Sequence, residues 1–264
     1  MDSIQLESVS KIFRHRPALS NWLGHEKRGE TRALDEISLR IHGGSVLALL
    51  GPNGSGKTTL LKLIATMLLP DAGRVLVGGE DTHSAGPAIR QRVGFAVAAE
   101  RSFFPRLSAR ENLDFFAALD NVPRRQRSER IQALLDQTGL REHADTLVMK
   151  FSSGMYQRLG VARALLKQPT VILLDEPTRS LDPTSTEEFW NLVQGFRDRG
   201  ATILVATHNF EEASALGDSI AVLQAGHLAD YRDLNRASTR ELRSWYLEAT
   251  GELAALPIAA GGWQ

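Results

Sequence analysis

Cysteine is missing from this 264-residue chain, long apolar runs are missing, and the charges leave no net excess of either sign. Without cysteine the chain forms no disulfide and has no thiolate nucleophile or thiolate metal ligand. No stretch approaches the ~18 consecutive apolar residues of a membrane-spanning helix. The 31 Lys and Arg residues balance 31 Asp and Glu residues, which argues against a domain-wide electrostatic footprint for nucleic acid. What remains is a charge-balanced chain whose 42% hydrophobic content can build a core.

The stretch at residues 51–59, GPNGSGKTT, fits the pattern G-x-x-x-x-G-K-[ST] of a phosphate-binding loop. Its glycines let the backbone turn tightly, so that successive N–H groups face anionic oxygens. Lys57 adds a charge for the β- and γ-phosphates, and the Thr58 hydroxyl is a ligand type for Mg²⁺. The loop is flanked by an apolar run at residues 45–50 and a helix-like run at 58–68. A glycine turn that precedes a lysine by chance would not account for both flanking segments. The predicted phosphate-binding residues are Gly51, Pro52, Asn53, Gly54, Ser55, Gly56, Lys57, Thr58 and Thr59.

Two further apolar runs end in polar residues. The run at 171–175 ends in Asp175, which is followed directly by a second carboxylate, Glu176, and the run at 203–207 is followed by His208. In phosphate-loop hydrolases an Asp in this position holds Mg²⁺ with the loop hydroxyl. A carboxylate one residue later can orient or deprotonate a water. Strand ends on one side of a parallel sheet converge on the ligand. We therefore predict Asp175 as a metal ligand and Lys57, Glu176 and His208 as catalytic residues. The alternatives are that the two acids only cap a helix and that the histidine is structural.

A second candidate anion site lies at residues 151–158, FSSGMYQR. Ser152, Ser153 and Gly154 are small and stand at the expected start of a helix, and helix N-termini bind anions. The sequence alone does not bring this segment to the loop at residue 51.

Strand patterns at residues 3–13 and 33–41 open the chain, and the first is predicted to be an edge strand. The basic segment at 14–32 reads as a surface loop, with contact to lipid headgroups through Trp22 as the alternative. Apolar runs with crossover helices predict an α/β fold, a mostly parallel sheet flanked by helices. A helical subdomain at about 100–166 is inserted into that core. The predicted division is a domain at 1–235 and a C-terminal helix and tail at 236–264.

In their order and spacing, the motifs resemble those of the nucleotide-binding subunits of ABC transporters, over nearly all of residues 3–235. GPNGSGKT resembles the Walker A loop, and LLDEP resembles Walker B followed by its catalytic glutamate. FSSGM stands where the family has the signature LSGGQ, and SLD, ending at Asp182, resembles the D-loop. His208 takes the place of the switch histidine. Phe13 stands where the family usually has an aromatic that stacks on adenine.

The resemblance implies a P-loop NTPase core with an N-terminal antiparallel β part, hydrolysis of ATP with Mg²⁺, and two copies arranged head to tail. Each ATP would lie between Walker A of one copy and Ser152, Ser153 and Gly154 of the other, with Asp182 nearby. Separate transmembrane permease subunits would hold the chain at the cytoplasmic face of the inner membrane. Ser153 departs from the signature glycine. Glu100 stands at the usual Q-loop glutamine, which implies a further ligand of Mg²⁺ or its water.

The ERSF and SSGM variants resemble the exporter branch, whose membrane halves are separate polypeptides. A soluble ABC ATPase that acts on nucleic acid or the ribosome is the alternative. Such proteins usually carry two cassettes, coiled coils or zinc-bearing insertions, and this chain has one cassette and no sustained heptads. A regulator without turnover is the third interpretation, and the intact Glu176 argues against it. We expect no nucleic-acid partner.

Overall fold

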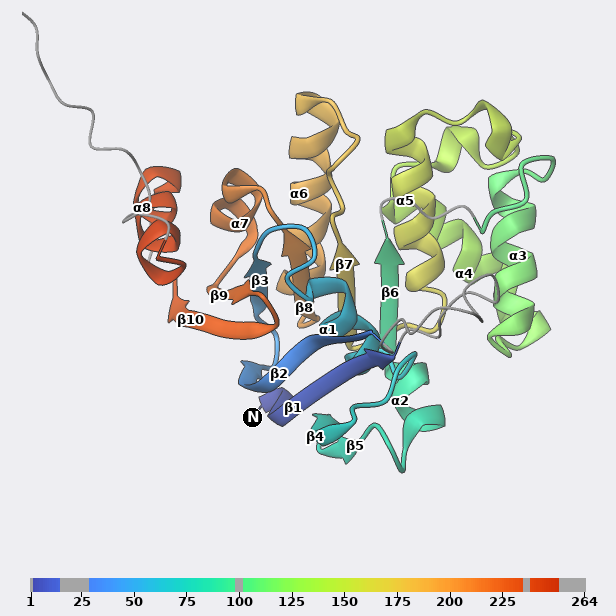
Figure 1. The fold of residues 1–264 in the computed structure, drawn as a ribbon. Coiled ribbons are helices and arrows are strands. Elements are labelled where there is room, and N and C mark those ends of the chain that lie inside the picture. The colour runs from blue at the N-terminus through green and yellow to red at the C-terminus, as the bar shows by residue number, and fades with distance from the viewer. Residues whose placement is uncertain (1, 15–28, 98–101, 235–237, 252–264) are drawn as a thin grey trace, which may run out of the picture.

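The computed structural model describes residues 2–14, 29–97, 102–234 and 238–251. Two sheets and the helices around them form this part of the chain (Figure 1). Trp22, Glu100 and the tail at 252–264 lie outside the described residues, so the predictions for them stay predictions.

The smaller sheet is antiparallel and has the strand order β2-β1-β4-β5. Its strands are β1 (Asp2–Arg14), β2 (Glu30–His42), β4 (Ala72–Val77) and β5 (Glu80–Asp81). The edge prediction for the first strand was wrong, because Ile4 pairs with Ile41 on one side and with Val77 on the other. Alternating apolar residues report that one face of a strand is buried, and they say nothing about how many neighbours it has.

The larger sheet has the order β10-β9-β3-β8-β7-β6 and is parallel except for β10. Its strands are β3 (Val46–Leu50), β6 (Val93–Val97), β7 (Val171–Asp175), β8 (Thr202–Thr207), β9 (Ser219–Gln224) and β10 (His227–Asp233). All residues of β3, β7 and β8 are buried, as expected for strands covered on both faces. Because these three strands are neighbours and run in one direction, the residues that follow them meet at one edge.

Helices flank this sheet and gather in a lobe beside β6 (Figure 1). The lobe contains α3 (Ala109–Leu119), α4 (Arg124–Gln137) and α5 (Ser153–Ala164), joined by short 3-10 turns at Arg141–His143 and Val148–Lys150. A capping box of Ser108 and Glu111 opens α3. Leu113 and Leu159 of the lobe share one buried cluster with Leu174 of the sheet. The lobe and the α/β core therefore pack as a continuous body.

The remaining helices are α1 (Lys57–Ile64), α2 (Gly86–Arg92), α6 (Pro183–Asp198), α7 (Phe210–Leu216) and α8 (Thr239–Ala249). The helix α8 lies beside α7 and β10, and its Trp245 Nε1 donates to Asp230 Oδ2 at 2.6 Å (Figure 1). None of the described helices combines the length and the apolar composition that a membrane crossing requires.

Candidate nucleotide site

The loop between β3 and α1 needs glycine at two positions for different reasons. Gly56 has φ +109°, and a Cβ there would stand 2.5 Å from the Ala33 carbonyl oxygen. At Gly51 a Cβ would stand 2.2 Å from the Leu223 carbonyl oxygen, a separation that backbone atoms do not tolerate. The loop is thus packed against β2 and β9 and enters α1 directly at Lys57.

Lys57 is buried under this loop with only 6% of its surface exposed. Its Nζ donates to the carbonyl oxygens of Gly51 at 2.6 Å and Pro52 at 3.2 Å. The same Nζ lies 3.4 Å from Glu176 Oε1. The ammonium group therefore connects the loop after β3 to the carboxylate that follows β7.

Thr58 and Asp175 form the second link between these segments. Thr58 Oγ1 donates to Asp175 Oδ2 at 2.7 Å, while Asp175 Oδ1 is buried and has no hydrogen-bond partner among the described residues. Burial raises the pKa of Asp175, and the hydrogen bond from Thr58 opposes that rise. The described residues contain no cluster of three His, Cys, Asp or Glu side chains that could hold a metal alone. A single carboxylate beside a hydroxyl fits Mg²⁺, which proteins often bind through one or two carboxylates together with substrate phosphates.

Glu176 and His208 face each other across two strand ends, with Glu176 Oε2 2.6 Å from His208 Nδ1. The Glu176 amide donates to the Ala206 carbonyl at 2.8 Å, which fastens its backbone to β8. Glu176 has φ +50°, a left-handed conformation that costs a non-glycine residue roughly 1–3 kcal/mol. Such strain persists where the surroundings hold a residue in place, and it is common at active sites.

A cavity of about 320 Å³ lies over these groups. Its lining residues are Thr31, Arg32, Ala33, Pro52, Asn53, Gly54, Ser55, Gly56, Lys57, Thr58, Thr59, Val97, Asp175, Glu176 and Arg179. Phe13 is outside this lining, although it pairs across the sheet with Thr31, which is part of it. The structure therefore gathers Lys57, Thr58, Asp175 and Glu176 around one hollow, while His208 is bonded to Glu176 and is not part of the lining.

The segment at 152–154 and Asp182 lie together, away from this cavity. Ser152 caps α5 by accepting from the Met155 amide at 3.2 Å, so α5 begins at Ser153. Ser153 Oγ donates to the Ser180 carbonyl at 2.8 Å, and Asp182 caps α6. Both serines are exposed. Within one chain, the two candidate anion sites are separate surfaces.

Several side chains at the site have no motif that announces them. Arg32 and Arg179 bring positive charge to the cavity wall, but Arg32 arrives there only through the register of β2. Glu212, in α7, is buried close enough to Glu176 for the two charges to interact. The sequence does show an acid in a short helix directly after His208. It does not show that this acid is buried, because the helix has only seven residues.

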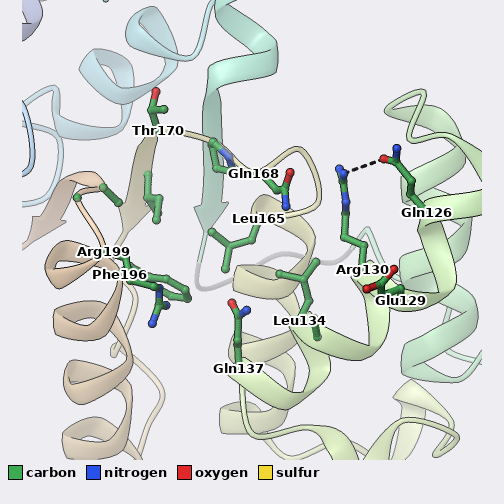
Figure 2. A pocket seen from close by; sticks show the side chains of 15 residues that line it. Gln126, Glu129, Arg130, Leu134, Gln137, Leu165, Gln168, Thr170, Phe196 and Arg199 are labelled. Atoms are coloured by element: carbon green, nitrogen blue, oxygen red, sulfur yellow. Dashed lines mark hydrogen bonds between the residues drawn. The ribbon is translucent and has the colours of Figure 1, made fainter.

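The chain has a larger cavity elsewhere, of about 640 Å³. Figure 2 shows Arg130 and Leu134 on one wall, and Phe196 and Arg199 on the other. Thr170, at its lining, directly precedes β7, so the cavity opens at the edge of the sheet opposite Asp175. Size therefore does not identify the nucleotide site in this chain.

A family model described as ABC transporter matches residues 34–179. The chain is also 37% identical to the ABC transporter ATP-binding protein NatA of Bacillus subtilis (strain 168), over 77% of this chain and 82% of NatA. The chain belongs to the ABC transporter family. As an ABC ATPase it binds and hydrolyses ATP.

Other relatives of this ABC ATPase are longer. It is 39% identical to the daunorubicin resistance ATP-binding protein DrrA3 of Streptomyces coeruleorubidus, over 78% of this chain and 65% of DrrA3. It is 38% identical to the Nod factor export ATP-binding protein I of Burkholderia lata, over 76% of this chain and 66% of that protein. Among solved structures it is similar to a dimeric post-hydrolysis state of the ATP-binding cassette MJ0796 bound to ADP and Pi. The sequence identity is 26% and the TM-score is 0.76, and the match covers 88% of this chain and 99% of the MJ0796 chain. The predicted P-loop NTPase α/β fold is confirmed.

Proposed function

We propose that this ABC ATPase hydrolyses ATP with Lys57, Asp175, Glu176 and His208 and drives export through a separate transmembrane subunit. The observation that carries the hydrolytic part is one continuous set of contacts. Lys57 Nζ lies 3.4 Å from Glu176 Oε1, and Glu176 Oε2 lies 2.6 Å from His208 Nδ1. A buried cation, a carboxylate and an imidazole thus stand in a row at the end of the phosphate loop.

Each residue of the row has its own task. Lys57 and the loop amides bind phosphate oxygens, and Thr58 with Asp175 would hold Mg²⁺, which neutralises phosphate charge when bound. Glu176 orients a water and accepts its proton, because its carboxylate is held by the ammonium on one side and the imidazole on the other. His208, about half exposed, holds Glu176 and would contact the γ-phosphate of bound ATP. Glu100 remains a proposed additional ligand of Mg²⁺ or its water.

A second copy of the chain would complete the site, head to tail. Ser152 and Ser153 are exposed small residues at the start of α5, and they lie outside the cavity that contains Lys57. Supplied from a partner copy, this helix start would add anion-binding groups opposite the phosphate loop. The similar MJ0796 cassette is dimeric in its post-hydrolysis state, which supports this arrangement. Phe13 would then flank the adenine.

The membrane subunit has a candidate docking surface on the helical lobe. Four large apolar side chains there are exposed by 40–64%: Phe104, Phe115, Leu119 and Met149. The rings of Phe104 and Phe115 lie 4.8 Å apart, so the surface begins as an aromatic pair. Monomeric proteins rarely leave such clusters uncovered. We assign this surface to a helix of a transmembrane partner, which would keep the chain at the cytoplasmic face of the membrane.

Export as the direction of transport rests on the relatives, whose names describe drug resistance and Nod factor export. The alternative of a nucleic-acid or ribosome ATPase gains no support, because these relatives are transporter subunits. The test is purification of the tagged chain from detergent-solubilised membranes of its own cell, with ATPase rates before and after addition of lipid. A multi-span membrane protein that co-purifies and raises the rate supports the proposal. A chain confined to the soluble fraction and stimulated by RNA or DNA would contradict it.

A further inference from the structure

Glu212, on α7, is a buried acid that has no task in the hydrolytic site described above. Only 1% of its surface is exposed. Its carboxylate accepts a hydrogen bond from Trp190 Nε1 at 3.4 Å, and the hydroxyls of Thr207 and Thr178 lie close enough to it to favour its charged form. Burial raises its pKa, and the charge of Glu176 adds to the rise. Burying an acid is unfavourable, so a retained one with three donors beside it has a structural or functional reason.

The two threonines stand directly beside the catalytic pair. Thr207 is the last residue of β8 and precedes His208, while Thr178 lies two residues after Glu176. Thr207 Oγ1 also accepts from the Asn209 amide at 3.0 Å, so His208 is bracketed by residues of one hydrogen-bonded turn. Glu212 therefore touches both segments that carry the pair, the turn after β7 and the turn after β8.

We propose that Glu212 is a positioning residue for the pair of Glu176 and His208. The proposal rests on the hydrolytic role given to that pair above. A carboxylate has enough lone pairs to accept from both threonines at once, so it fixes the spacing of the two turns. Glu176 needs such support because its backbone is left-handed at φ +50°. Its contact with His208 Nδ1, at 2.6 Å, depends on that spacing.

A purely structural role makes different predictions. Glu212 also bonds Trp190 of α6, so its loss could simply loosen the packing of α6 on α7. Loose packing lowers the melting temperature and damages ATP binding together with turnover. A positioning role instead lowers kcat while KM for ATP holds. The reason is that Glu212 contacts α6 and the turns after β7 and β8, whereas the phosphate loop joins β3 to α1.

The experiment compares Glu212→Ala, Glu212→Gln and Glu211→Ala, with steady-state ATPase kinetics and circular dichroism melts. Glu211 is the matched control, because it is an exposed acid one residue earlier in the same helix turn. We expect Glu212→Ala to lower kcat by about tenfold to a hundredfold with KM for ATP changed less than about twofold. We expect Glu212→Gln, which keeps an acceptor oxygen, to restore most of kcat, and Glu211→Ala to match wild type.

Thr178→Val removes one donor to Glu212 and keeps the side-chain shape, so it carries the test if Glu212→Ala does not fold. We expect a lower kcat in Thr178→Val. The double variant with Glu212→Gln should have a kcat no lower than that of Thr178→Val alone. Wild-type kcat in Glu212→Ala or in Thr178→Val, or equal losses in kcat, KM and melting temperature without rescue by Gln, overturns the inference. Glu176→Gln run alongside separates the two proposals: if it turns over normally, the hydrolytic assignment itself fails.

Discussion

The hydroxyl of Thr58 donates a 2.7 Å hydrogen bond to Asp175 Oδ2, although 117 positions separate the two residues. The bond spans from the start of α1 to the end of β7, with β8 between β3 and β7 in the sheet. Parallel strand order thus brings together two ligand types that the chain keeps far apart. The other oxygen of Asp175 is buried and has no hydrogen-bond partner in the described part of the chain, so it would be available to the proposed cation.

Asp175→Asn should weaken the Mg²⁺ dependence of hydrolysis. We expect the Mg²⁺ concentration for half-maximal ATPase rate to rise by about tenfold to a hundredfold, since an amide is a weaker ligand than a carboxylate. Magnesium titrations at saturating ATP measure the shift. Thr58→Val should move it in the same direction, and the double variant should be less than additive because the two side chains are bonded. Strictly additive losses would contradict a shared cation.

Lys57→Ala should lose nucleotide affinity, because its buried ammonium lies under the loop to which we assign the phosphates. Hydrogen bonds to charged groups contribute about 1.5–3 kcal/mol, so Kd for ATP should rise by roughly tenfold to a hundredfold. Isothermal titration calorimetry with the purified chain measures Kd. Lys150→Ala, which removes an exposed lysine from the helical lobe, is the control. Unchanged ATP binding by Lys57→Ala would overturn the phosphate-loop assignment.

Glu176→Gln should bind ATP and turn it over slowly. The amide keeps the size of the side chain but cannot accept a proton from water, so kcat should fall by about a hundredfold or more. Phosphate-release kinetics and Kd for ATP, measured on the same preparation, separate turnover from binding. Hydrolysis near the wild-type rate would remove Glu176 from the mechanism.

Gly154→Asp should block assembly of two copies on ATP without blocking ATP binding to one. A carboxylate at the exposed start of α5 would repel the phosphates of a partner's nucleotide. In a Glu176→Gln background, size-exclusion chromatography with ATP and Mg²⁺ should show a dimer, and addition of Gly154→Asp should return it to a monomer. A dimer that persists would mean that the segment at 152–154 does not face a partner's ATP.

Glu212→Gln should stabilise the fold more at pH 8 than at pH 5. Because burial raises the pKa of Glu212, the folded state holds its proton more tightly than the unfolded state. The stability contributed by that proton is present below the unfolded pKa and is lost as pH rises through the folded value, whereas glutamine does not titrate. Thermal melts of both proteins at the two pH values test this, with Glu211→Gln as control. A melting-temperature difference that does not grow with pH would contradict it.

Residues with fixed local spacing could be predicted from the sequence. The phosphate loop needs glycine, lysine and threonine at set positions on one short segment, and Asp175 with Glu176 follows one apolar run. The convergence of these residues with His208 followed from the rule that parallel strand ends meet. Those parts of the prediction depend on the pattern of apolar residues and on neighbouring strands that run in the same direction, and both can be inferred from the sequence.

Other features depend on tertiary contacts. The central place of β1 follows from pairing with β4, more than 60 residues later. Arg32 reaches the cavity through strand register, which one extra residue would reverse. Helix α6 starts at Pro183, because the Asp182 side chain caps it by accepting from the Ser185 amide at 3.0 Å. Glu212 could not be foreseen as buried, since it is one of two adjacent acids in the first turn of α7.

The left-handed backbone of Glu176 has a consequence for laboratory evolution of this ATPase. Glycine adopts that conformation without steric strain, so replacement of the glutamate by glycine relieves the strained backbone at this position in the native state. Selection for heat resistance alone would therefore tolerate loss of the residue to which we assign turnover. Libraries screened for thermostability need a simultaneous screen for phosphate release, because they would otherwise enrich variants that are more stable but inactive.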